Sequence, residues 1–334
     1  MIVVTGATGF VGNVLLRSLA ARRAGGGTLP AGPVRALVRR GRDTSSLAGL
    51  DAEVVEGDVG KVDSLVAAFH GADAVFHVAG MVSIGGDKLE RLRTINVQGT
   101  RNVIEACRLA GVRRLVHTSS IHAFVEPPMG TCTDESTPID PQRSLGAYAI
   151  SKAEATQSVL AAAREGLDAV VVFPTGIIGP YDFRPSHTGQ LVISAVRRKL
   201  MAYVHGAYNF VDVRDVADGM IAAFERGRSG EGYLLGGHEI SVCDLLRTIE
   251  ELSGVPAPRL RLNFRFVRAV SFLIPPYYWI TRQKPLFTTY SLDVISSNCC
   301  VDSSRAAREL GFSPRPLRET LADTIRWFKD QGML

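Results

Sequence analysis

The sequence predicts an α/β fold in which a doubly wound parallel sheet is followed by a smaller C-terminal lobe. Three observations predict it. Up to about Phe173, short apolar runs alternate with longer segments of helical periodicity. A glycine-rich turn joins the first run to the first helical segment. After Phe173 the periodicity loosens, and Pro174, Pro180 and Pro185 interrupt the chain. We therefore expect a dinucleotide-binding domain at residues 1–173 and mainly a substrate-binding lobe at residues 174–334, with some segments returning to the first domain.

The elements follow in order along the chain. Six apolar runs are expected to form strands: Ile2–Val4, Val34–Val38, Ala52–Val55, Ala74–Val78, Leu115–His117 and Ala169–Phe173. Helical segments lie between them at Val11–Arg22, Ser64–Phe69, Leu89–Leu109 and Tyr148–Arg164. Strands and helices that alternate in this way predict a parallel sheet covered on both faces. Further helices are expected near Gln190–Arg198, Val213–Arg226, Ser241–Leu252 and Leu317–Phe328.

Composition bounds the class of protein. A chain of 334 residues with 46% hydrophobic and 21% charged residues folds into a globular protein that buries roughly 75% of its unfolded surface. The net charge of +5 suits an anionic ligand or surface without requiring one. Because no recognised binding motif accompanies the charge, we expect no nucleic-acid partner.

The cysteines and the N-terminus indicate the compartment. Five cysteines occur without a CxxC pair or a histidine at metal-ligand spacing, so we expect reduced thiols and no metal. The first apolar run reaches Thr5-Gly6 at once, which is too short for a signal peptide. No segment has the roughly 20 apolar residues of a membrane span. These features predict a cytoplasmic protein.

The glycine-rich turn is a candidate phosphate site. Its sequence is Thr5-Gly6-Ala7-Thr8-Gly9-Phe10-Val11-Gly12. In such a turn the first glycine allows the tight bend, the second lets backbone N–H groups approach a pyrophosphate, and the third lets helix and strand pack closely. The alternative is an ordinary glycine turn, but the position between a strand and a helix favours dinucleotide binding.

The next strand distinguishes the two nicotinamide dinucleotides. NAD sites place a carboxylate at its end for the ribose hydroxyl, whereas NADP sites place an arginine there for the 2′-phosphate. Val34–Val38 ends in Arg39-Arg40, which predicts NADP, with NAD or two merely solvated arginines as alternatives. Asp58 and Val59 follow the third strand, where Asp58 either accepts from the adenine amino group or caps the next helix.

A tyrosine and a lysine form the candidate catalytic pair. Tyr148 and Lys152 lie four residues apart at the start of a helical segment, so their side chains project from one face. A nearby ammonium favours the phenolate and is expected to lower the tyrosine pKa. Taken alone, the pair is more typical of an ordinary helix than of a catalytic site. Thr118-Ser119-Ser120 lie at the carboxyl end of a parallel strand, where a serine hydroxyl is placed to hydrogen-bond the same substrate oxygen.

The order of several motifs resembles the extended short-chain dehydrogenase/reductases. The motifs are Thr5–Gly12, His77-Val78-Ala79-Gly80, Asn96-Val97, Thr118-Ser119-Ser120, Tyr148 to Lys152, Pro174-Thr175-Gly176-Ile177-Ile178-Gly179-Pro180 and Phe210-Val211-Asp212-Val213. The match spans nearly the whole chain. Within the family, Val34–Arg40 and Val112–Ser120 are most similar to the dihydroflavonol reductase, cinnamoyl-CoA reductase and 3β-hydroxysteroid dehydrogenase branch.

The resemblance implies roles for these residues. Tyr148 would be the general acid/base, Lys152 would bind the nicotinamide ribose and lower the tyrosine pKa, and Ser120 rather than Ser119 would orient the substrate oxygen. Asn96 would support the helix that carries part of the proton relay. The remaining cofactor contacts would come from Val78, Ala79, Gly80, Pro174, Thr175, Gly176 and Ile177.

One departure from the family bears on the reaction. Nucleotide-sugar epimerases of this family carry Arg-Asp before the stretch that corresponds to Phe210–Val213, and the arginine contacts the sugar diphosphate. This sequence has Tyr208-Asn209 there, and Asp212 replaces a histidine. We therefore expect an NADP(H)-dependent oxidoreductase that interconverts a carbonyl and an alcohol. The alternatives are a nucleotide-sugar epimerase or dehydratase with tightly bound NAD(P), and a non-catalytic dinucleotide sensor or membrane-associated scaffold.

The substrate is expected to be bulky and apolar, such as a steroid, a flavonoid-like phenolic or an aryl carbonyl. Arg259–Lys284 carries six basic residues and no acid among aromatic and aliphatic side chains, and forms either a pocket lid or a peripheral membrane contact. The side chains expected in the pocket are His122, Phe124, Tyr181, Phe183, His187 and Tyr278. The resemblance further implies a homodimer through Leu89–Leu109 and Tyr148–Arg164.

Overall fold

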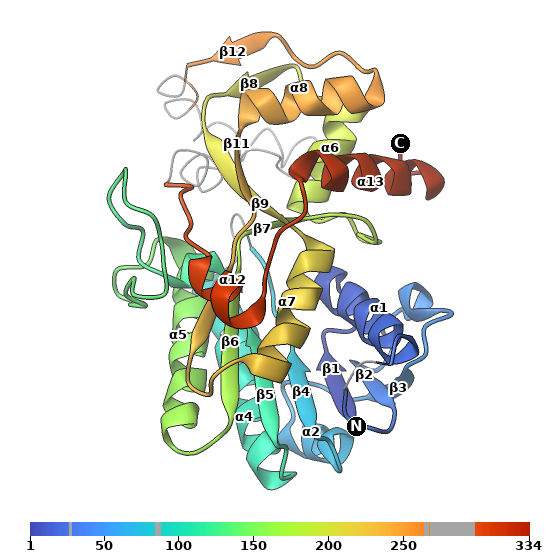
Figure 1. Cartoon of the computed structure of the whole chain (residues 1–334), viewed down its shortest axis with the longest axis vertical. Coiled ribbons are helices and arrows are strands. Elements are labelled where there is room, and N and C mark those ends of the chain that lie inside the picture. Colours follow the sequence, from blue (N-terminus) through green and yellow to red (C-terminus); the bar gives the residue numbers. More distant parts are fainter. Residues whose placement is uncertain (27–28, 84–87, 264–266, 268–297) are drawn as a thin grey trace.

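A parallel sheet forms the lower half of the molecule (Figure 1). The structure is a computed structural model that describes residues 1–26, 29–83, 88–263, 267 and 298–334. Within these residues the sheet has seven strands in the order β10-β6-β5-β4-β1-β2-β3, all parallel. Their bounds are β1 (Ile2–Thr5), β2 (Val34–Val38), β3 (Glu53–Glu56), β4 (Ala74–His77), β5 (Arg114–Thr118), β6 (Ala169–Pro174) and β10 (Gly232–Leu235).

Helices cover both faces of this sheet, which confirms the predicted doubly wound architecture (Figure 1). One face packs against α1 (Phe10–Ala24), α7 (Val213–Arg226) and α12 (Ser304–Leu310). The other packs against α2 (Val62–Phe69), α4 (Gly99–Leu109) and α5 (Gly146–Arg164). Successive strand residues point to opposite faces, so each strand contributes apolar side chains to both layers.

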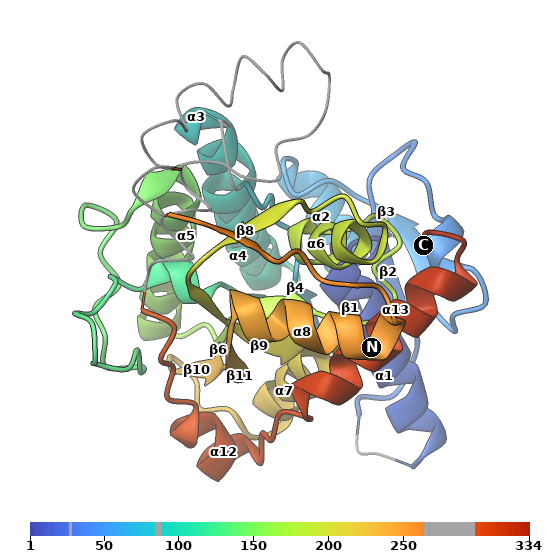
Figure 2. The ribbon, with the colours of Figure 1, turned by 90° about the horizontal axis from the view of Figure 1, so that it is seen from above.

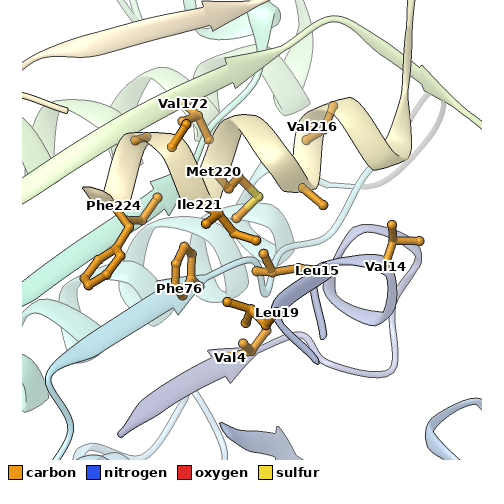
Figure 3. Packing of buried hydrophobic residues seen from close by; sticks show 14 of the residues in the cluster. Val4, Val14, Leu15, Leu19, Phe76, Val172, Val216, Met220, Ile221 and Phe224 are labelled. Atoms are coloured by element: carbon orange, nitrogen blue, oxygen red, sulfur yellow. The ribbon is translucent and has the colours of Figure 1, made fainter. Parts of the chain in front are cut away.

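The packing of α1 against α7 shows how the first layer is filled (Figure 3). Leu15 and Leu19 of α1 pack with Met220 and Ile221 of α7 around Phe76 of β4, and all five side chains are buried. Because α7 lies 189 residues or more beyond α1 in the chain, a segment from the C-terminal half completes the core of the N-terminal domain.

The expected helix Leu89–Leu109 is interrupted by a wider turn. It consists of α3 (Leu89–Leu92), the π-helical segment η2 (Arg93–Gln98) and α4 (Gly99–Leu109). Asn96 is buried inside the π-helical turn. Single π turns inside α-helices occur often at functional sites, because they re-aim one side chain.

The C-terminal lobe lies above the carboxyl ends of the parallel strands (Figure 1). Its strands are β7 (Gly176–Ile178), β9 (Ala207–Asp212) and β11 (His238–Ser241) in one sheet, and β8 (Ala202–Val204) and β12 (Leu260–Leu262) in another. Its helices are α6 (His187–Val196), α8 (Val242–Ser253) and α13 (Leu317–Asp330). They enclose a separate apolar cluster, and α8 and α13 lie side by side (Figure 2).

An ion-pair network fastens the lobe to α7. Asp212, whose side chain is fully buried, accepts from the backbone N–H of Arg214 at 2.7 Å and thereby caps α7. The Arg214 guanidinium pairs with Asp212 at 2.7 Å and with Asp323 of α13 at 2.8 Å. Arg315 pairs with Asp215 at 2.7 Å. Since buried charges need partners on several sides, the network fixes how α7, β9 and α13 meet.

The cysteine prediction was wrong for one pair. Cys132 and Cys300 form a disulfide across 168 residues of sequence, whereas Cys107, Cys243 and Cys299 are thiols. The two partners meet through an isolated parallel bridge between Thr133 and Val301, a tertiary contact that spacing along the chain does not reveal. Two short helical turns, η1 (Ser45–Leu47) and η3 (Ile121–Ala123), complete the described elements.

Candidate active site

The glycine-rich turn forms a cradle that excludes side chains. Gly6 has a φ of 69°, and a Cβ there would lie 2.8 Å from the backbone nitrogen of Ala79. A Cβ on Gly12 would lie 2.3 Å from the carbonyl oxygen of Gly6. Gly9 donates its N–H to Gly6 at 2.9 Å and leads into α1, which has no acidic residue in its first turn. The bare helix N-terminus fits a pyrophosphate.

A chain of buried hydrogen bonds connects this cradle to the end of β4. The Thr5 hydroxyl accepts from the N–H groups of Val78 and Ala79, both at 3.1 Å. The His77 ring lies 2.9 Å from Thr5 Oγ1 through Nδ1 and 3.0 Å from Thr100 Oγ1 through Nε2. Burial lowers the pKa of His77 to about 3, so the ring is neutral.

The directions of these hydrogen bonds assign the tautomer of His77. Thr100 donates its hydroxyl proton to the carbonyl oxygen of Asn96 at 2.6 Å, so Thr100 must accept from His77 Nε2–H. Nδ1 is then the acceptor for the Thr5 hydroxyl. Through Thr5 and Thr100, His77 therefore holds β1, β4 and the π-helical turn together. The sequence motif His77–Gly80 alone did not reveal this role.

Asn96 is held in one orientation beside the end of β4. Its amide donates to the carbonyl oxygen of Met81 and to Ser151 Oγ, both at 3.0 Å, and its oxygen accepts from the N–H of Met81 at 2.7 Å. A Cβ on Gly80 would lie 3.4 Å from Asn96 Oδ1 and 3.7 Å from Lys152 Nζ. The exposed backbone of Gly80 thus borders the side chains of Asn96 and Lys152. The space left by the missing Gly80 side chain fits a ligand group.

Tyr148, Lys152 and Ser120 come together as predicted from their positions. Tyr148 and Lys152 are buried on α5, and Ser120 is buried just after β5. The Tyr148 hydroxyl hydrogen-bonds Ser120, and the half-buried His122 ring meets the Tyr148 ring edge-on with centroids 6.0 Å apart. Lys152 donates to the carbonyl oxygen of Thr118 at 2.9 Å.

The protonation of this group differs from the expectation. Burial raises the pKa of Tyr148 to about 12, against a smaller lowering by Ser120, so the expected lowering is absent in the free protein. Burial also lowers the pKa of Lys152 to about 8 and that of His122 to about 4. At neutral pH Tyr148 therefore carries its proton, Lys152 is charged and His122 is neutral.

Two further polar residues lie behind the pair. Ser119 points away from Tyr148 and shares a 2.6 Å hydrogen bond with Thr156, which donates to the carbonyl oxygen of Lys152 at 2.7 Å. This geometry separates the two serines and explains why Ser120 is the one beside Tyr148. His117 is fully buried next to His77, and neither of its ring nitrogens has a hydrogen-bond partner in the described part of the chain.

The residues expected at the adenosine end follow β2 and β3. Arg39 is exposed at the end of β2 and forms no ion pair within the residues described, whereas Arg40 lies 3.9 Å from Glu56. Asp58 Oδ1 accepts from the N–H of Gly60 at 2.9 Å in a local turn, and the N-cap of α2 is Lys61, so the alternative in which Asp58 caps this helix is wrong. The carbonyl oxygen of Val59 accepts from Asn102 at 2.7 Å.

The segment after β6 closes the other side. Pro174 ends β6, and the buried Thr175 has a hydroxyl without a hydrogen-bond partner among the described residues. A Cβ on Gly176 would lie 2.9 Å from the Phe210 ring. Ile177 accepts from the hydroxyl of Thr188 at 2.6 Å. The unpartnered Thr175 hydroxyl, the cradle at Gly6 and Gly12 and the exposed backbone of Gly80 fit a bound dinucleotide.

The side chains expected to contact substrate are dispersed. Of these, His122 lies beside Tyr148. Phe124 packs in the core against Phe173, with ring centroids 4.5 Å apart. Tyr181 lies beneath the Arg17 guanidinium at 4.4 Å, and Phe183 contacts Trp327. Phe173 of β6 is thus the partner of Phe124, and Arg17 of α1 and Trp327 of α13 are the partners of Tyr181 and Phe183.

Two further substrate contacts were expected, His187 and Tyr278. His187 is exposed at the first residue of α6. Tyr278 lies outside the described residues, as does most of Arg259–Lys284. Among the residues described, no group of acidic, histidine or cysteine side chains could hold a metal ion, and no helix is long and apolar enough to cross a membrane.

The fold and this site define an enzyme class: a Rossmann-fold protein with a Ser-Tyr-Lys group at the carboxyl edge of its sheet. Residues 2–236 match the NAD dependent epimerase/dehydratase family. The chain belongs to this family of NAD-dependent enzymes, which confirms the resemblance to the extended short-chain dehydrogenase/reductases.

Three comparisons illustrate the range of the family. The chain is 37% identical to "Sterol demethylase protein B" of Methylococcus capsulatus over 99% of both proteins. It is 30% identical to a 4-hydroxy-2-methyl-3-oxo-4-farnesyl-3,4-dihydroquinoline-1-oxide ketoreductase of Stigmatella aurantiaca, over 97% of this chain and 95% of the relative. A crystal structure of a nucleoside-diphosphate-sugar epimerase from Pseudomonas aeruginosa is 27% identical, with a TM-score of 0.81 and coverage of 100% and 98%.

Proposed function

We propose that the protein is an NADP(H)-dependent oxidoreductase that interconverts a carbonyl and an alcohol on a bulky, largely apolar substrate. The observation that carries this proposal is the buried Tyr148 hydroxyl, which keeps its proton at neutral pH and is hydrogen-bonded to Ser120. A neutral acid aimed at one oxygen is what carbonyl reduction needs, because the carbonyl oxygen must gain a proton as the carbon gains a hydride.

The dinucleotide supplies or accepts the hydride when it is bound. The turn from Thr5 to Gly12 would hold its pyrophosphate against α1, with Thr8, Phe10 and Val11 at the mouth of the turn. Gly80 borders Lys152 and Asn96 closely enough for the nicotinamide ribose to lie there. Thr175 offers an unpartnered hydroxyl after β6.

The protein's own side chains manage the proton. Tyr148 would give its proton to the carbonyl oxygen in reduction and take it back in oxidation, while Ser120 would hold that oxygen by a hydrogen bond. The Lys152 ammonium would stabilise the phenolate left behind, since an opposite charge nearby favours the ionised form. Asn96, fixed by Met81 and Ser151, would keep the π-helical turn against α5.

The preference for NADP rests on Arg39. Its guanidinium is exposed where β2 ends, at the position from which a family member contacts the adenosine ribose. A carboxylate at this position would favour NAD, and an arginine can hold two phosphate oxygens at once.

The proposed substrate class draws on the two named relatives. One is named for sterol demethylation and the other for reducing a ketone that carries a farnesyl group. Both names describe large apolar molecules. The chain's own basic aromatic segment, Arg259–Lys284, suits such a substrate whether it acts as a lid or as a membrane contact.

A nucleotide-sugar epimerase is the second candidate, favoured by the epimerase structure of similar shape. The residues at the diphosphate-contact positions argue against it. Tyr208 stacks on Phe210 with centroids 5.0 Å apart, and Asn209 accepts from the N–H of Gly237 at 2.8 Å. Neither side chain carries the positive charge that a diphosphate requires.

A panel of sterol ketones, phenolic carbonyls and nucleotide sugars, assayed for NADPH consumption, tests the proposal. We expect stoichiometric NADPH loss with at least one apolar ketone, and alcohol as product. Interconversion of a nucleotide sugar without net NADPH loss would instead establish the epimerase. Homodimerisation through α4 and α5 remains a prediction, which sedimentation velocity can test.

A further inference from the structure

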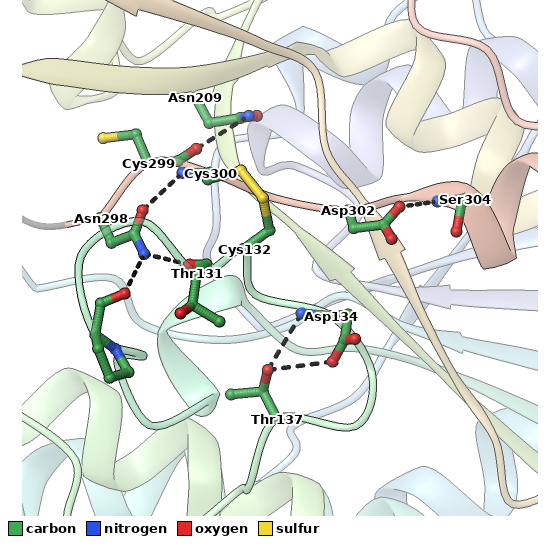
Figure 4. Close-up of a disulfide and its surroundings, with 11 residues drawn as sticks. Thr131, Cys132, Asp134, Thr137, Asn209, Asn298, Cys299, Cys300, Asp302 and Ser304 are labelled. Atoms are coloured by element: carbon green, nitrogen blue, oxygen red, sulfur yellow. Dashed lines mark hydrogen bonds between the residues drawn. A yellow bond between two sulfur atoms is a disulfide. The ribbon is translucent and has the colours of Figure 1, made fainter.

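The disulfide joins two segments that lie far apart in the sequence (Figure 4). Cys132 lies in the loop of residues 124–145, which runs from η3 to α5 and hence from His122 to Tyr148. Cys300 lies in the segment of residues 298–303, which precedes α12. The bond therefore ties the loop of residues 124–145 to a segment that also contacts β9 of the lobe.

The local backbone favours this pairing. Thr133 donates its N–H to the carbonyl oxygen of Cys300 at 2.9 Å and accepts from the N–H of Asp302 at 2.9 Å. This parallel register pairs Thr133 with Val301, so Cys132 lies opposite Cys300 one residue earlier. Asn298 donates to the carbonyl oxygens of Pro128 at 3.1 Å and of Thr131 (Figure 4). These hydrogen bonds remain available when the sulfurs are reduced.

The neighbouring Cys299 does not compete for Cys132. Successive residues of an extended segment point in opposite directions, and the Cys299 thiol donates to the carbonyl oxygen of Ala207 in β9 at 3.0 Å. Burial, with Glu239 and Glu126 nearby, raises the pKa of Cys299 to about 11. Because the thiolate is the attacking species in exchange, Cys299 stays inert at neutral pH.

We propose that Cys132–Cys300 is a reversible thiol-exchange site that sets how firmly the loop of residues 124–145 is held beside the active site. Cys132 is exposed and Cys300 is half-buried, so a small thiolate can reach the bond through Cys132. Attack on the Cys132 sulfur forms a mixed disulfide and releases the Cys300 thiolate. A second thiol then displaces Cys132, so two external thiols are oxidised as the protein bond gains two electrons.

Reduction is expected to loosen the loop without unfolding the protein. The loop keeps other anchors: Glu135 accepts from the N–H of Leu234 at 2.9 Å, and Gln157 donates to the carbonyl oxygen of Ile139 at 3.0 Å. The released constraint acts on the two ends of the loop, where His122 and Tyr148 lie in contact. A substrate that binds there would have to order the loop on binding.

Thiol counting tests the site without reference to catalysis. Protein equilibrated with glutathione disulfide, then freed of it and denatured, should show the three thiols that lie outside the bond. After dithiothreitol treatment of the folded protein, alkylation should label Cys132 and Cys300, leave the buried Cys107 unlabelled, and lower Tm by about 5–10 °C. Five thiols after the oxidising treatment, or no labelling of the pair before denaturation, would overturn the proposal.

The effect on the active site rests on the proposed function and is measured separately. In the reductase assay, reduction should raise KM for the ketone by roughly 3–10-fold, the factor expected when one more side chain must be ordered at binding. Cys132→Ser should show the higher KM under both conditions, and Cys299→Ser should respond like the wild type. Equal KM values for the oxidised and reduced protein would refute the coupling. Absence of any turnover would refute the proposed function and leave the thiol count as the test of the site.

Discussion

The phosphate end of the site is built from backbone, whereas the catalytic end is built from buried side chains. At the proposed phosphate end, Gly6 and Gly12 leave no room for a Cβ, and α1 begins without an acidic side chain in its first turn. At the catalytic end, Tyr148, Lys152 and Ser120 are all buried, and their environment changes their proton affinity. Substitutions at the first end should therefore disturb folding and cofactor binding together, whereas Tyr148→Phe at the second should disturb chemistry alone.

The largest effect is expected at the catalytic end. Tyr148→Phe removes the proton donor but keeps the ring that packs against His122, so kcat should fall by about 10²–10⁴-fold while Tm and NADPH binding stay unchanged. Tyr203→Phe in β8 is the control and should keep its kcat. Turnover of Tyr148→Phe close to that of the wild type would show that another group moves the proton.

A glycine substitution tests the phosphate end. Gly12→Ala would push a methyl group to 2.3 Å from the Gly6 carbonyl, and a backbone atom cannot rotate away. We expect a loss of about 3 kcal/mol in the free energy of unfolding, together with weaker NADPH binding. Gly25→Ala, at the other end of α1, meets its nearest atom at 3.5 Å and should change little. Equal denaturation midpoints for the two variants would contradict the claim that residue 12 has no room for a Cβ.

The exposed Arg39 should matter for binding and not for folding. Arg39→Asp should weaken NADPH binding by roughly 10–100-fold and favour NADH, because a charge-assisted contact to the 2′-phosphate is replaced by repulsion. Arg40→Asp, one residue further and near Glu56, should have a smaller effect. Titration calorimetry measures both, and a wild type that prefers NADH would refute the role of Arg39.

The smallest expected effect is on the pH dependence. Burial lowers the pKa of Lys152 to about 8, so raising the pH from 7 to 9 should remove the charge and lower kcat/KM for reduction by about tenfold. Tyr148, with a pKa of about 12, stays protonated throughout. Lys152→Arg should abolish this fall, since arginine keeps its charge. If kcat/KM of Lys152→Arg still falls between pH 7 and 9 as in the wild type, a group other than Lys152 is responsible for the pH dependence.

Lys152 also has a stability signature. Its folded pKa lies below the ordinary value of 10.5, so between about pH 8 and 10.5 the unfolded chain binds more protons than the folded one. This group's contribution to the free energy of unfolding should therefore rise with pH across that window. Lys152→Met should flatten the rise in chemical denaturation.

The same contrast explains what the sequence could predict. The six strands up to Phe173 and the helices between them match the structure within a residue or two, because buried parallel strands read as continuous apolar runs. The fold and the grouping of Ser120, Tyr148 and Lys152 followed from motif order. The short strands β7 to β12 were missed, including β10, whose four residues extend the main sheet from far along the chain.

Properties that depend on tertiary contacts could not be predicted from the sequence. The π-helical turn at Asn96 looks like ordinary helix in the sequence. The raised pKa of Tyr148 comes from burial, which spacing to Lys152 does not report. Tyr181 was expected in the pocket, but with a φ of 72° it lies under Arg17 of α1. The sequence predicted that some segments after residue 174 return to the first domain but did not identify them, and these segments include α7 and α12.

Product analysis with a sterol ketone and NADPH tests the central claim most directly. If Tyr148 delivers a proton to the carbonyl oxygen of an apolar substrate, one alcohol should appear for each NADPH consumed, and Tyr148→Phe should abolish both changes together. No consumption of NADPH across apolar ketones, combined with interconversion of a nucleotide sugar, would contradict the account.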